Sequence, residues 1–291
     1  MTQIKNSLFI ITGAASGIGQ AVAVAAARAG AYVLATDVNQ TGLDQTVAAA
    51  TQAGGRADAI RLDVGDAAQI EAFARQVADQ FPQQRIILLN NAGVALGSNT
   101  FEYNDLADFE WLLNINLWGV VRMSKAFLPL LLARPGSHLA NVSSVFGFCG
   151  PPETAAYSTA KFAVRGFTDV LRNELAGKDV AVSTVFPGGV RTNIAAGSRL
   201  GGGRTEDQKA IVVQKFAERT MTTPEQAAAV ILRGIEQNKA RILIGFDAKL
   251  IDWVTRLLPT RYGPILLPGI AQTFAPKEAQ ALTPNPAPEQ R

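Results

Sequence analysis

Apolar and polar residues alternate in two recurring patterns along the first 245 positions. Continuous apolar runs that end in a glycine or a polar residue are typical of parallel strands buried on both faces. Such runs predict seven strands, at residues 7–13, 31–37, 57–64, 85–93, 137–144, 180–188 and 240–245. Apolar residues with helical spacing predict helices at residues 18–30, 39–53, 66–80, 106–132, 153–176 and 223–237. The alternation predicts an α/β fold: a doubly wound, mostly parallel seven-stranded sheet with helices on both faces.

The pattern changes towards the C-terminus and divides the chain into parts. Residues 1–246 are predicted to form one domain. Within it, the glycine-rich polar segment 188–222 has one short helical patch and is predicted to be a substrate lid, because such segments inside compact domains are usually functional. Residues 247–291 are predicted to be a hydrophobic extension that ends in a flexible tail.

The extension is apolar over residues 247–274 but carries Asp252, Arg256 and Arg261 within it. These charges argue against a membrane span. An amphipathic helix on the surface and a hydrophobic cover over a pocket both remain as interpretations. The first of them would allow contact with a membrane surface.

Charge and composition exclude several functions. The net charge is +3, from 27 basic and 24 acidic residues scattered along the chain, so we expect no nucleic-acid binding. With Cys149 as the one cysteine and His138 as the one histidine, we expect neither an internal disulfide nor a metal site. The N-terminal apolar run leads directly into a glycine-rich turn without a signal-peptide pattern, which predicts a cytoplasmic protein.

The turn after the first predicted strand has the sequence "TGAASGIG", with Gly13, Gly17 and Gly19 before a helix. Glycines at this point let a chain turn tightly onto a helix N-terminus, where unpaired N–H groups favour a pyrophosphate. A loop without a ligand is the alternative, but the strand–turn–helix context favours a dinucleotide.

Asp37 ends the second predicted strand. A carboxylate there can accept hydrogen bonds from the ribose hydroxyls of an adenosine and would repel a 2′-phosphate. Because Ser16 stands in the glycine turn where a cation would favour NADP, the sequence favours NAD over NADP. A solvated acid or the N-cap of the next helix is the alternative interpretation of Asp37.

Tyr157 and Lys161 lie four positions apart in the predicted helix 153–176, so both project from one helix face. A free tyrosine has a pKa of about 10 and is a weak base at neutral pH. A nearby ammonium and the positive nicotinamide of an oxidised cofactor would both favour the phenolate, so the pattern predicts a lowered Tyr157 pKa, suited to general acid–base catalysis. An ordinary amphipathic helix surface is the alternative.

Five motifs over residues 5–245 together resemble the short-chain dehydrogenase/reductase family. They are the turn TGxxxGxG at residues 12–19, "NNAG" at 90–93, "NVSS" at 141–144, the YxxxK element "YSTAK" at 157–161 and "PGGVRT" at 187–192. The resemblance implies a Rossmann-like fold, a nicotinamide cofactor and hydride transfer between a carbinol carbon and the cofactor.

The resemblance also implies the site residues. The catalytic group would be Asn116, Ser144 (rather than Ser143), Tyr157 and Lys161, with Asn116 (rather than Asn114) holding a water beside Lys161. The implied cofactor contacts are Gly13, Ser16, Gly17, Ile18, Gly19, Asp37, Asp63, Val64, Asn90, Ala92, Gly93, Tyr157, Lys161, Pro187, Val190 and Thr192.

The substrate is the least constrained part of the prediction. Apolar residues follow Ser144, and no Lys or Arg is placed by the sequence to hold a phosphate or carboxylate, which favours an apolar or bulky secondary alcohol or ketone. These apolar residues could equally be core. Two other functions remain open: a peripheral-membrane enzyme of the same family with a lipid-like substrate, and a non-catalytic dinucleotide-binding regulator. By analogy with the family, we expect a homodimer or homotetramer that assembles through two central helices.

Overall fold

The computed structural model describes residues 1–97 and 99–274, and its centre is a seven-stranded sheet in the order β3-β2-β1-β4-β6-β7-β9. Every neighbouring pair in this sheet is parallel. Its strands are β1 (Leu8–Thr12), β2 (Tyr32–Asp37), β3 (Arg56–Arg61), β4 (Ile86–Asn90), β6 (Ser137–Val142), β7 (Val180–Pro187) and β9 (Arg241–Ile244). The predicted doubly wound α/β fold is therefore confirmed, with a sheet that is wholly parallel.

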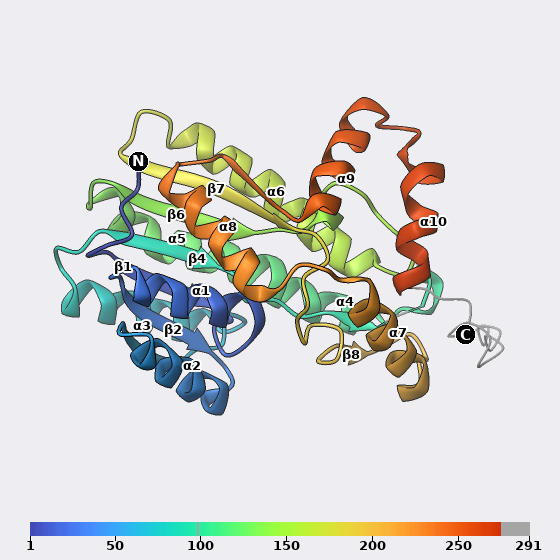
Figure 1. The fold of residues 1–291 in the computed structure, drawn as a ribbon, viewed down its shortest axis with the longest axis horizontal. Helices are drawn as coiled ribbons and strands as arrows, with labels where there is room; N and C mark the ends of the chain where they lie inside the picture. Colours follow the sequence, from blue (N-terminus) through green and yellow to red (C-terminus); the bar gives the residue numbers. More distant parts are fainter. Residues whose placement is uncertain (98, 275–291) are drawn as a thin grey trace.

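Helices cover both faces of the sheet (Figure 1). One face packs against α1 (Gly17–Arg28), α2 (Gln40–Gln52) and α8 (Pro224–Glu236), and the other against α3 (Ala67–Gln80), α5 (Gly119–Leu132) and α6 (Ala155–Glu174).

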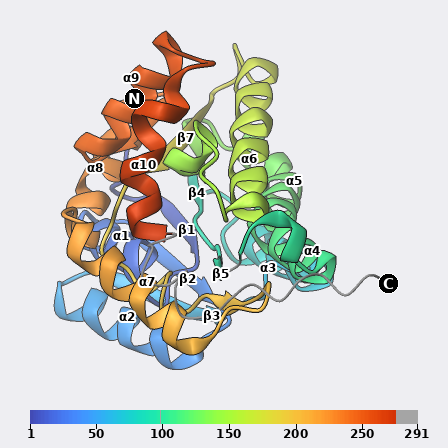
Figure 2. The ribbon, with the colours of Figure 1, turned by 90° about the vertical axis from the view of Figure 1, so that its right-hand side faces the viewer.

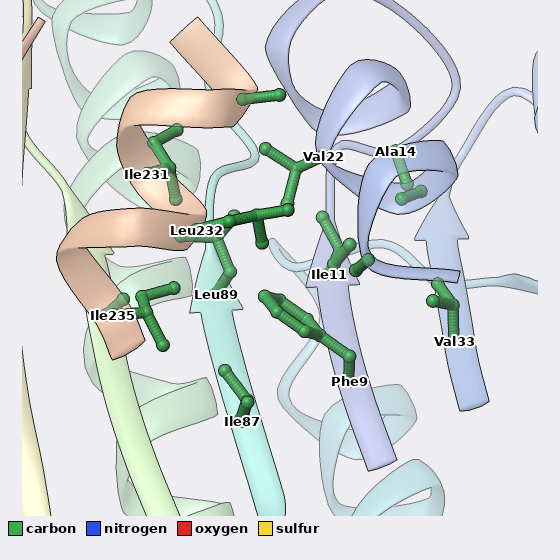
Figure 3. Close-up of a cluster of buried hydrophobic side chains, with 14 of the residues drawn as sticks. Phe9, Ile11, Ala14, Val22, Val33, Ile87, Leu89, Ile231, Leu232 and Ile235 are labelled. Carbon is green, nitrogen blue, oxygen red and sulfur yellow. The ribbon is translucent and has the colours of Figure 1, made fainter. Parts of the chain in front are cut away.

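Alternate residues of each strand enter opposite cores, as the pleat of a strand requires. Phe9 of β1 belongs to the core under α1 and α8, whereas its neighbour Ile10 belongs to the core under α3 and α5. Figure 3 shows Phe9 and Leu89 of the sheet facing Val22 of α1 and Ile231 of α8. Burial on both faces explains why the strands read as continuous apolar runs.

The start of α8 follows directly from its sequence. Thr223 is the N-cap and Pro224 the first helical residue. The Thr223 hydroxyl accepts from the backbone N–H of Gln226, and the Gln226 side chain accepts from the backbone N–H of Thr223, which completes a capping box. The helix start predicted at residue 223 is thus confirmed.

The predicted helix 106–132 is interrupted. It consists of α4 (Leu106–Leu113), a π-helical turn (Asn114–Trp118) and α5. In the part of the chain that the structure describes, this is the one helical stretch long and apolar enough to span a membrane, with a mean hydropathy of 1.3. Met123, Phe127 and Leu131 of this stretch are fully buried against the sheet. Their burial in the core accounts for the apolar composition of α5.

The segment after β7 is more ordered than the sequence predicts. It contains the two-residue strand β8 (Arg199–Leu200), which pairs with β5 (Leu96–Gly97), and the 14-residue helix α7 (Glu206–Arg219). The sequence predicted one short helical patch there. Strand β8 has no local signal because its partner lies in the loop after β4.

The apolar extension forms α9 (Phe246–Leu257) and α10 (Tyr262–Phe274). Helix α9 is amphipathic, and its Ala248 and Ile251 join a core cluster with Phe186 of β7. Figure 2 shows α10 between α9 and α7 at one end of the sheet. Arg219 of α7 donates to the Gly269 carbonyl and to Gln272 of α10, so these two helices are tied together. The predicted flexible tail beyond residue 274 lies outside the described residues.

Candidate active site

A cavity of about 640 Å³ opens at the carboxyl end of the sheet, beneath α7, α9 and α10. Strands β1 and β4 are neighbours there, and the chain leaves them towards opposite sides of the sheet, β1 to β2 and β4 to β6. Such a switch point is where doubly wound sheets bind ligands. Eight of the predicted site residues line the cavity: Ile18, Gly93, Ser144, Tyr157, Lys161, Pro187, Val190 and Thr192.

Tyr157 and Lys161 share the inward face of α6, as predicted from their spacing. Lys161 is 3% exposed, and its Nζ donates to the Val142 carbonyl at 3.1 Å. The same Nζ lies 5.5 Å from the centroid of the Tyr157 ring. The predicted pairing of a phenol with an ammonium is therefore present in the structure.

Burial governs the ionisation of both groups. It lowers the pKa of the Lys161 ammonium to about 8, because a charged amine loses hydration there. It raises the pKa of the Tyr157 phenol to about 12, with a hydrogen bond to Ser144 acting in the opposite direction. The sequence predicted a lowered Tyr157 pKa. That expectation is wrong for the protein alone, in which the phenol is held protonated at neutral pH.

The two serines of the "NVSS" motif have different partners. Ser143 donates its hydroxyl to the Lys161 carbonyl at 2.7 Å, which fixes it in a local role, as expected. Ser144 begins the short helical turn Val145–Gly147, where its Oγ accepts from the backbone N–H of Phe146 at 3.1 Å. The Ser144 hydroxyl also hydrogen-bonds to the Tyr157 phenol, so the two hydroxyl groups stand side by side where a substrate oxygen could meet both.

Asn116 is fully buried in the π-helical turn. Its side-chain amide donates to the Val94 carbonyl and accepts from the Val94 N–H, both at 2.8 Å. A Cβ built on Gly93 would lie 3.3 Å from Asn116 Oδ1 and 3.6 Å from Lys161 Nζ, so these two side chains meet at Gly93. Asn114 instead bonds to Arg122 and the Gly65 carbonyl, away from Lys161. The water-holding role of Asn116 stays a prediction.

The glycine turn forms a close cradle at the start of α1. Gly13 has φ +68°, and a Cβ there would lie 2.7 Å from Ala92 Cα. A Cβ on Gly19 would collide with the Gly13 carbonyl oxygen. Ser16 is the N-cap of α1, but its hydroxyl caps no helix N–H. These open N–H groups and the lack of side chains fit a pyrophosphate.

Asp37 holds this turn in place. Its carboxylate accepts from the Ala15 N–H at 3.1 Å and from the Asn39 N–H at 3.0 Å. The N-cap of α2 is Asn39, which accepts from the Gly42 N–H, so the alternative reading of Asp37 as a helix cap is wrong. Asp37 is half-buried, which leaves its carboxylate oxygens within reach of a ligand.

Three further predicted cofactor residues, Asp63, Val64 and Asn90, do not line the cavity. Asp63 accepts from the Gly65 N–H, and Val64 packs against Gly119. Asn90 does not line the cavity: its side chain donates to Asn141 and Ser124 inside the core. Its neighbour Asn91 does line the cavity.

Three further residues, Thr12, Asn91 and Asp247, hold the loops of the site together, although the sequence assigned them no role. The Thr12 hydroxyl accepts from the backbone N–H groups of Asn91 and Ala92, each at 3.0 Å. The Asn91 amide donates to the Thr12 and Gly13 carbonyls and so joins the β4 loop to the glycine turn. Asp247 of α9 accepts from the Gly189 N–H at 2.6 Å, which ties the C-terminal extension to the "PGGVRT" turn. Thr12 and Asn91 belong to the quoted motifs, whereas Asp247 has no local signal.

The structure also corrects the prediction that no Lys or Arg stands at the pocket. Arg204 and Lys209, from the segment predicted to be a lid, both line the cavity. Glu153, which precedes α6, lines it as well and pairs with Arg204.

His138 and Cys149 are fully buried. Burial lowers the pKa of His138 to about 3, and its ring bonds to Thr2 and Ser183, so it is a neutral structural residue. Burial raises the pKa of Cys149 to about 12, which leaves it an unreactive thiol. Within the described ranges, 1–97 and 99–274, no cluster of His, Cys, Asp and Glu is suited to a metal ion.

Comparisons with known proteins agree with this geometry. Residues 7–201 match the family model of the short chain dehydrogenases. The chain is 36% identical over 278 residues to SadH of Mycobacterium tuberculosis, an alignment that spans 94% of this chain and 99% of the relative. It is 30% identical over 258 residues to the ketoacyl reductase HetN of a Nostoc species, which spans 89% and 85%. A short-chain dehydrogenase from Burkholderia phymatum, solved in complex with NAD, superimposes with a TM-score of 0.78 at 27% identity and covers 88% of this chain and 96% of that structure.

The chain therefore belongs to the short-chain dehydrogenase family of oxidoreductases, which bind a nicotinamide dinucleotide. Its fold is the Rossmann-like fold of that family, as the resemblance implied.

Proposed function

We propose that the protein is an NAD-dependent oxidoreductase that interconverts a secondary alcohol and a ketone, with an apolar or bulky substrate. One observation carries the proposal: a single cavity joins Ser144, Tyr157 and Lys161 to Ile18, at the helix start that follows the glycine turn. Its wall is otherwise largely apolar, with Leu96, Val145, Phe146, Ile194, Val212, Phe216, Ile251 and Ile270. The relative HetN is named as a ketoacyl reductase, which agrees with ketone chemistry.

In the proposed mechanism the chain's own residues orient the substrate and move one proton. The nicotinamide, when bound, supplies or receives the hydride. The Ser144 hydroxyl donates to the substrate oxygen, and the Tyr157 phenol gives that oxygen a proton during reduction or takes one during oxidation. The Lys161 ammonium stabilises the phenolate that forms.

We propose NAD as the cofactor, with NADP disfavoured. Asp37 is positioned at the end of β2 by its bonds to Ala15 and Asn39, and a 2′-phosphate beside this carboxylate would be repelled. The positions next to Asp37 and the turn in sequence carry Ala15, Ser16 and Val38, none of which offers a positive charge to a phosphate, and the one cation paired with Asp37 in the sheet is Arg61 of β3.

The pH dependence of the two directions tests the assignment of Tyr157. Reduction needs the protonated phenol and oxidation the phenolate. Because burial raises the Tyr157 pKa to about 12, the protonated form prevails at neutral pH. We expect kcat/KM for alcohol oxidation to rise by up to about tenfold per pH unit from below neutrality to the Lys161 pKa of about 8, above which the ammonium that stabilises the phenolate is lost, while kcat/KM for ketone reduction stays level or falls. Steady-state assays in both directions on one substrate pair measure this, and an oxidation rate that is highest below neutrality would contradict it.

A second candidate is an enzyme that works at a membrane surface on a lipid-like substrate. Helix α9 turns an apolar stripe to solvent: Phe246 is 79% exposed and Trp253 64%, with Leu250 and Leu257 beside them. Lys249 and Arg256 flank the stripe on one side of the helix, which suits an anionic bilayer.

Co-sedimentation with vesicles containing phosphatidylserine tests this second candidate. Binding that is accompanied by a blue shift of tryptophan fluorescence, and that is lost in Trp253→Ser with Phe246→Ser, would support a membrane surface. Equal partitioning of the wild type with and without vesicles would exclude it.

We further propose a cytoplasmic homodimer or homotetramer that assembles through α5 and α6. The π-helical turn before α5 exposes Trp118, and α6 exposes Phe162 and Val170, which leaves apolar side chains on this face of the protein. Light scattering on the purified protein measures the assembly, and a monomer at micromolar concentration would contradict it.

A further inference from the structure

The apolar cavity contains a buried ion pair that the proposed reaction does not use. Arg204 and Glu153 bond to each other, and their side chains are 4% and 7% exposed. Both residues line the same cavity as Ser144 and Tyr157. A buried ion pair is weak evidence for stability, because well-packed apolar residues of similar volume often serve as well or better. The pair therefore calls for a further explanation at this place.

Arg204 retains unused donor capacity. A guanidinium carries N–H donors on three nitrogens. Within residues 1–97 and 99–274, Glu153 is the one acceptor that this guanidinium reaches, and the buried Arg204 Nε has no partner. A buried donor without a partner costs stability unless a ligand satisfies it. An acceptor atom inside the cavity would remove that cost.

The backbone is shaped to bring the two residues together. Glu153 has φ +64°, a conformation that residues with a side chain rarely adopt, directly before Thr154, the N-cap of α6. Gly202 and Gly203 have φ +62° and +72° and turn the chain into Arg204, directly before α7. The pair thus stands between the helix that carries Tyr157 and the helix that covers the cavity.

We propose that Arg204, oriented by Glu153, binds an uncharged acceptor oxygen of the substrate that is remote from the reacting carbon. The substrate class is then a largely apolar ketone or alcohol that carries a second carbonyl or hydroxyl group. We infer an uncharged acceptor because both basic groups at this part of the cavity already have a carboxylate partner. Arg204 pairs with Glu153, and the Lys209 ammonium lies 4.0 Å from the Glu206 carboxylate. This assignment rests on the proposed function, since it names the substrate class of that same cavity.

The competing explanation is that the pair only fastens α7 to the start of α6. That explanation predicts an equal effect of Arg204 variants on every substrate. If Arg204 binds a second oxygen, Arg204 variants should change the ratio of kcat/KM between substrates with and without that oxygen. A purely structural role would not change this ratio.

The test uses one series of ketones: a long-chain methyl ketone, the same chain with a second carbonyl moved stepwise away from the first, and the same chain with a terminal carboxylate. We measure kcat/KM with NADH, and binding by calorimetry in the presence of NAD, where no turnover occurs. The variants are Arg204→Met and, because this change removes the positive charge that pairs with Glu153, the double variant Glu153→Gln/Arg204→Met. Arg134→Met is the matched control, because Arg134 is also buried with an unpartnered nitrogen but lies outside the cavity.

We expect one position of the second carbonyl to improve kcat/KM and affinity about ten- to hundredfold over the plain ketone. Both Arg204 variants should lose this gain, and Arg134→Met should keep it. A gain at no position, a gain that survives in the variants, or a larger gain from the carboxylate would overturn the inference. Failure to reduce any ketone, together with an Arg204-dependent gain in binding, would refute the proposed reaction and leave the inference standing. If every ketone is turned over and the ratio of kcat/KM between ketones with and without the second carbonyl does not depend on Arg204, the inference is refuted and the proposed reaction stands.

Discussion

Replacement of Tyr157 by Phe is expected to lower kcat by about 10²- to 10⁴-fold while NADH affinity stays within about twofold of the wild type. The change removes the phenol oxygen that carries the proton and keeps the ring. That ring packs edge-on against Phe146, with centroids 6.1 Å apart, so the fold should be unaffected. Steady-state assays and NADH fluorescence titration measure the two quantities.

Tyr32→Phe is the matched control for this variant. It removes another tyrosine hydroxyl, which bonds to Asp58 away from the cavity, and should leave turnover unchanged. If Tyr157→Phe turns over like the wild type, Tyr157 is not the acid and base. Retention of a biological output by the inactive variant would instead favour the non-catalytic dinucleotide-binding regulator.

Gly19→Ala is expected to raise the dissociation constant of NADH by about 100-fold or more. The added methyl would collide with the Gly13 carbonyl oxygen and lie 2.7 Å from Asn91 Nδ2, so the turn must move away from its observed position. Forcing extra volume into such a site also lowers the free energy of unfolding, by about 1–3 kcal/mol. Fluorescence titration and denaturant unfolding measure both effects.

Gly150→Ala is the control here, because a Cβ at this position meets no atom within 4 Å and the residue does not line the cavity. It should bind NADH normally and be about as stable as the wild type. Wild-type NADH affinity in Gly19→Ala would show that the glycine turn does not cradle the cofactor.

The central sheet was predictable because its information is local. A strand such as β4 is buried on both faces, so its apolar run is visible in the sequence without knowledge of its neighbours. Four of the five motifs were predictable for a related reason: each lies at the end of a strand, and the carboxyl ends of parallel strands meet at one edge of the sheet. Tyr157 lies on α6 instead, so its place beside Ser144 was implied by the resemblance to the family and not by a strand end.

The features that the sequence did not reveal depend on distant partners or on burial. Arg204 and Glu153 are 51 positions apart, and Asp247 and Gly189 are 58 apart, so no local pattern joins them. Helix α7 was expected as only a short patch because it has few buried residues and is held partly by the bonds of Arg219 to α10. For the protein alone, the direction of the Tyr157 pKa shift was not visible in the sequence, because the spacing shows the ammonium but not the burial of the phenol; the effect of an oxidised nicotinamide stays a prediction.

The most direct test of the account is turnover with NADH and with NADPH over a panel of ketones, from small and polar to bulky and apolar, followed by the absorbance of the reduced cofactor. We expect reduction of the bulky apolar members with NADH, and much weaker activity with NADPH. Activity confined to NADPH would contradict the role given to Asp37, and activity confined to small polar or charged substrates would contradict the role given to the apolar cavity.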